Sequence, residues 1–495
     1  MDVDYLRAAL RDGAELARRP EPDLYDRVLA RRRRSVRRRR AALAAGLSTL
    51  LVGIAIPVGL TTLVGGGESR PDGVASPPAI PYADIYGVPA RGSLAGDAAF
   101  VEAIRRLPWT DQATQPGTLP GESSLPDAPL ETRSVVFAGD VTGGRWALVV
   151  GQNTAQPTGP AADPDLTDLG SLSDIALAWF VGPPGASPDQ MALVTVPHGI
   201  PADQPTSLYD QFSGALVVVA APGDRIEISP RPEVEADATV NRTYADTNST
   251  DGTAVLAVDP NPYSAGGLPA VKYRITREGI PVAQQNPDSY GGANPEPPPA
   301  IALDYLRPPN YLLPDHLGGN QEQQLAEQIV TLYGLPADQI SFQVHYVGPL
   351  PGPTAARVQL AVVTAVLPSG AVFTDAFWLQ EMLLSDGTPT GANGASCAEE
   401  LAPAGLPPAQ RIIAMRCEVA TGNQTGPAPE STLVVIAPEG APDRSLMVEA
   451  DGGRTTILTG AAGGVSLTPF PEGAEVVTVE TGDGTVIEEV PIIGP

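Results

Sequence analysis

The feature that most constrains this chain is an uncharged stretch of 24 residues, Ala41 to Val64. A helix that rises about 1.5 Å per residue crosses the roughly 30 Å hydrocarbon core of a bilayer in about 20 residues. The stretch therefore predicts a transmembrane helix, which Pro57 would kink but not break. The alternative is a helix buried in a protein core, although such helices rarely stay uncharged over this length.

Basic residues precede this stretch. Residues 1–40 carry 13 arginines and 7 acidic residues, so the positive-inside rule predicts a cytoplasmic N-terminus. A cleavable signal peptide is the alternative, but signal peptides have a shorter basic region and an apolar core of about 7–15 residues. We therefore expect a retained single-pass anchor in the cell membrane, with the bulk of the chain extracytoplasmic. The arginines expected to contact anionic lipid headgroups are Arg31, Arg32, Arg33, Arg34, Arg37, Arg38, Arg39 and Arg40.

The rest of the chain has the opposite charge. After Val64 there are 18 basic and 50 acidic residues, and the whole chain has a formal net charge of −26. Because phosphate groups are bound by lysine and arginine, we expect neither nucleic acid nor an anionic lipid surface as a partner of this acidic body.

The chain has two cysteines, Cys397 and Cys417. In an oxidising compartment a lone pair predicts one disulfide, which loop entropy makes worth about 3 kcal/mol. Two free buried thiols are the alternative.

Proline-rich segments divide the acidic body. A spacer at 65–85, rich in proline, glycine and serine, leads to a first lobe at 86–286. A second proline-dense segment at 287–314 separates this lobe from a second lobe at 315–495.

Each lobe is predicted to begin with a short helix. The first is capped by Asp97 and the second by Asn320, and Gly334 ends the second. The predicted apolar stripes are Phe100, Ile104 and Leu107 in the first helix and Leu325, Ile329 and Leu332 in the second.

Strands separated by turns follow both helices, which predicts mainly antiparallel sheet with a helix on one face, an α+β fold. The predicted strands are 134–138, 145–151, 174–181, 192–196 and 214–220 in the first lobe and 341–346, 356–366, 372–379, 411–419 and 432–437 in the second.

Two local matches suggest that the lobes are similar. Leu216–Arg225 resembles Leu433–Arg444, and Val271–Val282 resembles Val476–Ile492. These matches predict an internal tandem repeat of about 200 residues. The alternative is that two β-rich lobes of similar composition match by chance.

Motifs for catalysis are weak. The chain has no Walker A, GxSxG or HExxH sequence, and its histidines, His198, His316 and His345, lack the spacing of metal ligands. His345 alternates with apolar neighbours, which favours a hydrogen-bonded histidine within a sheet. The acid pairs Glu399-Glu400 and Glu488-Glu489 would point to opposite faces of a strand, so neither is predicted to be a catalytic dyad.

Two acidic segments are candidates for weak calcium binding. Asp246–Ala257 begins like an EF-hand loop, but Asp251 stands where glycine is required and Ala257 where a bidentate glutamate is needed. Asp163, Asp165 and Asp168 form the other cluster. We interpret both as polar turns and predict no bound metal or cofactor.

Four tryptophans are candidates for a binding face. Trp146, Trp179 and Trp378 lie among apolar residues and are predicted to be in the core, whereas Trp109 follows a proline and is predicted to be accessible.

The N-terminal layout resembles that of known proteins. The stretch DLYDRVLARRRR at Asp23–Arg34, with the apolar run behind it, is similar to single-pass membrane proteins of high-GC Gram-positive bacteria, including some anti-sigma-factor-like regulators. The resemblance covers residues 1–65 and implies a cytoplasmic partner. It departs from many anti-sigma factors because no histidine or cysteine precedes His198, so the zinc signature is missing.

Together these features predict a membrane-anchored extracytoplasmic binding or sensor protein without catalytic activity. Its partners would be the lipid bilayer and an unidentified protein or envelope component. The alternatives are an anti-sigma-like transmembrane regulator and a cell-envelope hydrolase whose acids come from distant positions. A pocket with two carboxylates about 5–9 Å apart would favour the hydrolase.

Overall fold

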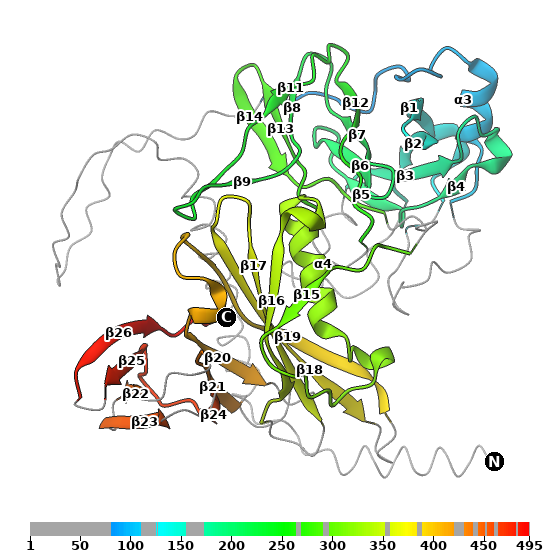
Figure 1. Ribbon diagram of the computed structural model, residues 1–495. Helices are drawn as coiled ribbons and strands as arrows, with labels where there is room; N and C mark the ends of the chain where they lie inside the picture. The colour runs from blue at the N-terminus through cyan, green and yellow to red at the C-terminus, as the bar shows by residue number, and fades with distance from the viewer. Residues whose placement is uncertain are drawn as a thin grey trace, which may run out of the picture. The chain divides into compact units, whose positions relative to one another are not determined.

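A computed structural model of the chain divides into two units, 1–76 and 77–495. The predicted membrane segment at 41–64 and the eight arginines before it lie outside the described residues. The described residues are 81–109, 125, 127–154, 173–263, 269–290, 297–351, 357–383, 389–419, 430–438, 444–450, 453–459, 464–481 and 484–494 (Figure 1).

The first lobe begins with a helix packed on an antiparallel sheet. Helix α3 (Ala98–Arg105) is capped as predicted, because Asp97 Oδ1 accepts from the amide of Phe100 at 3.0 Å. Phe100 and Ile104 pack against small and branched residues of the sheet, such as Val149. The strands of this sheet, in the order β1-β2-β3 with β4 and β5 both pairing β3, are β1 (Ser134–Val141), β2 (Gly144–Gln152), β3 (Ile175–Gly182), β4 (Ala192–Leu193) and β5 (His198–Ile200).

Two more sheets complete the first lobe as a β-sandwich. A three-stranded sheet, ordered β12-β7-β6, faces a four-stranded sheet ordered β11-β8-β13-β14, with Val218, Ile226 and Tyr273 in the core between them. As in the immunoglobulin fold, seven strands form two packed antiparallel sheets, but here the fourth strand, β11, pairs with β8 and not with β12. The strands are β6 (Thr206–Asp210), β7 (Ala215–Val219), β8 (Arg225–Ser229), β11 (Ala245–Asp246), β12 (Thr253–Ala257), β13 (Lys272–Arg277) and β14 (Ile280–Gln285), and a separate pair is formed by β9 (Glu233–Val234) and β10 (Val240–Asn241).

The second lobe has the same plan. Helix α4 (Gln321–Tyr333) packs on a five-stranded sheet ordered β15-β16-β17-β18-β19, in which β15 runs parallel to β16. Strand β15 comes from the proline-dense segment 287–314 and lies at the sheet edge, where proline-rich chain is tolerated. The strands are β15 (Leu303–Tyr305), β16 (Ser341–Pro349), β17 (Val358–Val366), β18 (Val372–Leu383) and β19 (Pro389–Ala402).

The sandwich of the second lobe repeats the first strand for strand. Its sheets are ordered β20-β21-β24 and β23-β22-β25-β26, so strands that follow one another in the chain take the same places in both lobes. Both sequence matches fall on equivalent strands: β7 and β8 match β21 and β22, and β13 and β14 match β25 and β26. This topology supports the predicted repeat. The strands are β20 (Ile413–Val419), β21 (Glu430–Ile436), β22 (Arg444–Ala450), β23 (Gly453–Thr459), β24 (Val465–Pro469), β25 (Val476–Thr481) and β26 (Val486–Pro491).

The three-stranded sheet is the middle layer of each lobe. On β7, Val217 faces the helix-covered sheet and packs with Trp179, whereas Val218 faces the four-stranded sheet. On β21, Val434 packs with Trp378 in the same way, and Leu433 faces the four-stranded sheet. Each lobe therefore has a helix and three sheets in successive layers.

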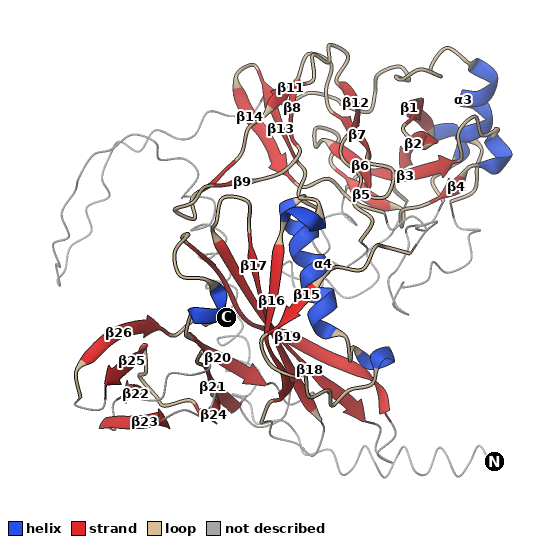
Figure 2. Cartoon of the chain, in the orientation of Figure 1, coloured by secondary structure: helices blue, strands red, loops and turns tan. Residues whose placement is uncertain are grey.

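The predicted α+β class is wrong. In the part of the chain that the structure describes, the α-helices are α3 and α4, with 8 and 13 residues, and strands make up most of the regular structure (Figure 2). None of the described helices has the length and apolar character needed to cross a membrane. The fold is β-rich because the short apolar runs separated by turns in 206–285 and 413–491 pair into sandwiches.

One predicted helix position is also wrong. Leu332 of α4 is 42% exposed, whereas its neighbours Val330 and Tyr333 are buried. Tyr333 packs edge-on against Phe373 at 5.5 Å between ring centroids, so the buried face of α4 includes Tyr333 and not Leu332.

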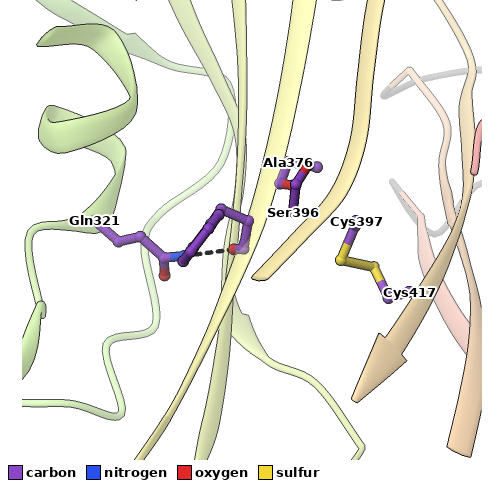
Figure 3. Close-up of a disulfide and its surroundings, with 6 residues drawn as sticks. Gln321, Ala376, Ser396, Cys397 and Cys417 are labelled. Atoms are coloured by element: carbon purple, nitrogen blue, oxygen red, sulfur yellow. Dashed lines mark hydrogen bonds between the residues drawn. A yellow bond between two sulfur atoms is a disulfide. The ribbon is translucent and has the colours of Figure 1, made fainter. Parts of the chain in front are cut away.

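A disulfide joins two layers of the second lobe. Cys397 on β19 and Cys417 on β20 are bonded to each other, with their Cα atoms 4.5 Å apart (Figure 3). The bond connects the helix-covered sheet to the three-stranded sheet. On the other side of the same sheet, the Gln321 amide of α4 donates to the carbonyl of Phe377.

Candidate functional site

A pocket of about 1080 Å³ lies where the sandwich of the first lobe meets helix α4 of the second. The first lobe contributes the chain that follows β12 and the ends of β8 and β13. The second contributes the last turn of α4 and the start of β16, and the proline-dense segment contributes β15. The lining residues lie within 209–211, 230–231, 258–263, 269–271, 299–304, 330–331 and 334–342.

Tyr263 fixes the first lobe to the second. It is 2% exposed and belongs to the buried cluster that includes Leu325 and Ile329 of α4. Its neighbour Asn261 accepts from the Tyr263 amide at 3.0 Å through Oδ1 and donates through Nδ2 to Thr331 Oγ1 at 2.9 Å. The wall that the first lobe contributes is therefore anchored to the helix by one aromatic side chain and one amide.

Gly334 allows the backbones of the two lobes to approach each other. It ends α4 in the left-handed conformation, with φ of 60°, which glycine adopts without strain. A Cβ atom at this position would lie 2.7 Å from the Cβ of Ala270 in the first lobe. A larger residue would therefore push apart the two walls of the pocket.

The floor and the mouth of the pocket differ in polarity. Val271, Val330, Ile340 and Phe342 line it and are buried. Four charged residues that line it are exposed, and among the described residues none of them forms an ion pair: Asp259, Asp304, Asp338 and Arg231. This arrangement suits the enclosure of an apolar group with a polar end toward solvent.

The predicted histidine sites are not brought together. His345 on β16 is 2% exposed, its Nε2 lies 3.0 Å from Thr364 Oγ1, and burial lowers its pKa to about 4. This confirms a hydrogen-bonded histidine within the sheet. His198 is exposed, with Nδ1 3.1 Å from the carbonyl of Val196, and His316 lies in a single turn of 3-10 helix.

The candidate calcium loop is a polar turn. Asp246 pairs with Arg225 at 2.7 Å and accepts from the Asn248 amide at 2.8 Å, and Asp251 accepts from the Thr253 amide at 2.9 Å. Within the described ranges, no three side chains of histidine, cysteine, aspartate or glutamate form a group that could hold a metal. The cluster of Asp163, Asp165 and Asp168 lies outside the described residues.

A buried acid that sequence reasoning missed lies beneath α4. Asp375 on β18 is 6% exposed and sits opposite Glu399 on β19. Burial, and then the charge of Glu399, raise the pKa of Asp375 to about 7. The signal in the sequence is an aspartate within the apolar run of β18, on the same face as Phe373 and Phe377.

All four tryptophans are 1% exposed. The prediction that Trp109 is accessible is therefore wrong. Its ring packs with Phe100 and Ile104 of α3, and the guanidinium of Arg133 lies 5.0 Å from the ring centroid. Besides α3, the residues that pack with it include Leu125, Ala128 and Val135 from later in the chain, so the local sequence around Pro108 does not reveal the burial.

Comparison of the chain with models of known protein families and with curated proteins finds no match.

Proposed function

We propose that this protein is a non-catalytic binding or sensor protein that takes a small ligand in the pocket between its lobes. The observation that carries this proposal is the pocket itself: an apolar floor, a polar mouth and walls from both lobes. Because each wall belongs to a different lobe, an occupant contacts both lobes at once. Occupancy would thus be coupled to the stability of the junction made by Tyr263 and Asn261.

We also propose that the two lobes act outside the cytoplasm, at the cell membrane. The disulfide supports this location because such bonds persist in oxidising compartments. The uncharged stretch 41–64 and the arginines before it support the membrane. Digestion of intact spheroplasts with protease should degrade residues 77–495 while a cytoplasmic marker protein survives. If residues 77–495 and the marker protein both resist the protease until the spheroplasts are lysed, the extracytoplasmic location is contradicted.

The two alternatives from the sequence stay as hypotheses. The anti-sigma-like regulator depends on residues 1–40, and loss of a co-purifying sigma factor when these residues are deleted would support it. The hydrolase would need acids of the pocket to act on a substrate, and the same Asp→Asn variants used below would then abolish turnover.

The binding proposal is tested on the full chain in lipid nanodiscs, with empty nanodiscs as background. The probes are 1-adamantanamine, 1-adamantanol and 1-adamantanecarboxylate, which share one compact apolar body, and binding is measured by calorimetry. Ala302 is exposed and lines the pocket, so Ala302→Trp should fill the space and weaken binding about tenfold or more, or about 1.4 kcal/mol.

The matched control is Ala245→Trp, an exposed alanine on β11 that does not line the pocket. It should bind the probes as the unmodified chain does. If no probe binds the unmodified chain, or if Ala302→Trp binds as well as the control, the pocket is not a ligand site.

A further inference from the structure

We infer that the pocket selects a small ligand with an apolar body and a positively charged end, such as an alkyl or alicyclic ammonium. This inference rests on the proposed function, because it concerns the same pocket. It is carried by the separation of apolar and acidic residues between the floor and the mouth.

The floor offers a ligand little that is polar. Val271, Ile340 and Phe342 are at most 6% exposed and supply only carbon atoms to the space. Two polar side chains beside them, those of Gln211 and Thr331, are already bonded within the protein. Gln211 donates to the carbonyl of Tyr263 at 3.0 Å, and Thr331 Oγ1 donates to the carbonyl of Glu327 at 2.9 Å.

The buried residues that line the pocket include no charged side chain, so a charged end of a ligand would find no counter-ion there and would lose its hydration. The apolar body therefore belongs at the floor, and any polar end belongs at the mouth.

The mouth has a net negative charge. Asp259, Asp304 and Asp338 come from three separate segments and face one opposing charge, that of Arg231. The whole body after Val64 is acidic as well, with 50 acidic against 18 basic residues. An anionic end would be repelled here and a cationic end attracted. Since these carboxylates are exposed, screening keeps the effect modest, on the order of a fivefold to tenfold preference at low salt.

The three adamantane probes test this directly, because they differ only in the charge of one substituent. With the full chain at low salt, 1-adamantanamine should bind about fivefold to tenfold more tightly than 1-adamantanol, and 1-adamantanecarboxylate most weakly. Raising the salt concentration should weaken the amine and leave the neutral alcohol unchanged.

Charge variants place the preference at the mouth. The combined variant Asp259→Asn, Asp304→Asn and Asp338→Asn should bind the amine and the alcohol equally, with no loss of alcohol binding. Arg231→Gln should increase the preference for the amine. The matched control neutralises three exposed acids that do not line the pocket, Glu472→Gln, Glu475→Gln and Glu489→Gln, and should keep the preference.

The outcomes separate the two proposals. If none of the probes binds, the proposed function fails. If the alcohol or the carboxylate binds as tightly as the amine, the pocket still binds ligands but the selectivity inferred here is overturned. The inferred selectivity is also overturned if the Glu→Gln control loses the preference for the amine as fully as the Asp→Asn variant does. The preference would then come from the charge of the whole protein surface and not from the mouth of the pocket.

Discussion

Arg91 and Arg307 occupy equivalent places in the two lobes. The guanidinium of Arg91 donates to the carbonyl of Ala220 at 2.7 Å, just past the end of β7, and that of Arg307 donates to the carbonyl of Ala437, just past the end of β21. Arg91 forms a parallel bridge with Phe137 of β1, and Arg307 follows β15, which runs parallel to β16. The pair repeats a contact between layers whose acceptors lie within the first sequence match, whereas the two arginines lie outside both matches.

Removal of Arg91 should destabilise the first lobe. Its guanidinium also donates to the carbonyls of Ile85 and Asp251, and Arg91→Leu would leave the buried carbonyls of Ile85 and Ala220 without this donor. We expect a loss of about 3 kcal/mol in the local free energy of unfolding, measured by hydrogen exchange. Arg106→Leu, at an exposed ion pair on α3, should lose under about 1 kcal/mol. Equal losses in the two variants would show that the contact between layers contributes little.

Reduction of the disulfide should destabilise the second lobe selectively. Loss of a cross-link that closes a loop of this size costs about 3 kcal/mol. Peptides from β19 and β20 should therefore exchange faster in reductant, while those from β1 to β3 should not change. The variant Cys397→Ala, Cys417→Ala should behave like the reduced chain and be insensitive to reductant. Full protection of β19 after reduction would contradict this.

Asp375 and His345 should have opposite effects on stability between about pH 4 and 6.5. Burial raises the pKa of Asp375 to about 7, so the folded chain holds a proton that the unfolded chain releases, and stability falls as pH rises. Burial lowers the pKa of His345 to about 4, so the unfolded chain holds the extra proton, and stability rises with pH.

Single substitutions should expose each contribution. The difference in free energy of unfolding between Asp375→Asn and the unmodified chain should increase by about 1.4 kcal/mol per pH unit as the pH rises through this range. The same difference for His345→Gln should decrease equally. Urea denaturation at intervals from pH 4 to 7 measures both slopes, and the double variant should show almost none. If the free energy of unfolding depends on pH in the same way for the unmodified chain, both single variants and the double variant, then burial does not shift the pKa of either Asp375 or His345 as described.

Tyr263 should couple the unfolding of the two lobes. Truncation of a large buried aromatic side chain costs about 3–5 kcal/mol, so Tyr263→Ala should destabilise α4 although the residue belongs to the first lobe. Hydrogen exchange of α4 peptides measures the loss. Tyr263→Phe keeps the ring and should have a much smaller effect. Unchanged protection of α4 in Tyr263→Ala would show that the junction does not support the helix.

Local sequence pattern predicted the strands well where burial alternates or is continuous. The segment 134–138 begins β1, and 214–220 contains the whole of β7. Strand β19 was missed because its sequence, PTGANGASCAEELA, has no apolar alternation. Its conformation comes from pairing with β18 along nearly its whole length, a tertiary effect that a local pattern does not carry.

The candidate pocket was not predictable from the sequence, for a related reason. Its walls come from loops and helix ends that are distant in the chain, such as 258–263 and 334–342, and contain several prolines but no recurrent spacing. The disulfide, by contrast, could be predicted from the presence of two cysteines and the expectation of an oxidising compartment. Prediction failed where a feature depends on which surfaces meet.

Burial of β7 and β21 on both faces has a consequence for which segments of the lobes tolerate substitution. A strand that packs between two layers has no side on which a polar or bulky replacement would be harmless, so few substitutions survive there. Surface strands and loops drift freely by comparison. If the lobes are a tandem repeat, they should therefore stay recognisable longest at LVVVAAPGDR and LVVIAPEGAPDR, the segments that contain most of these strands, and searches for distant relatives should begin from them.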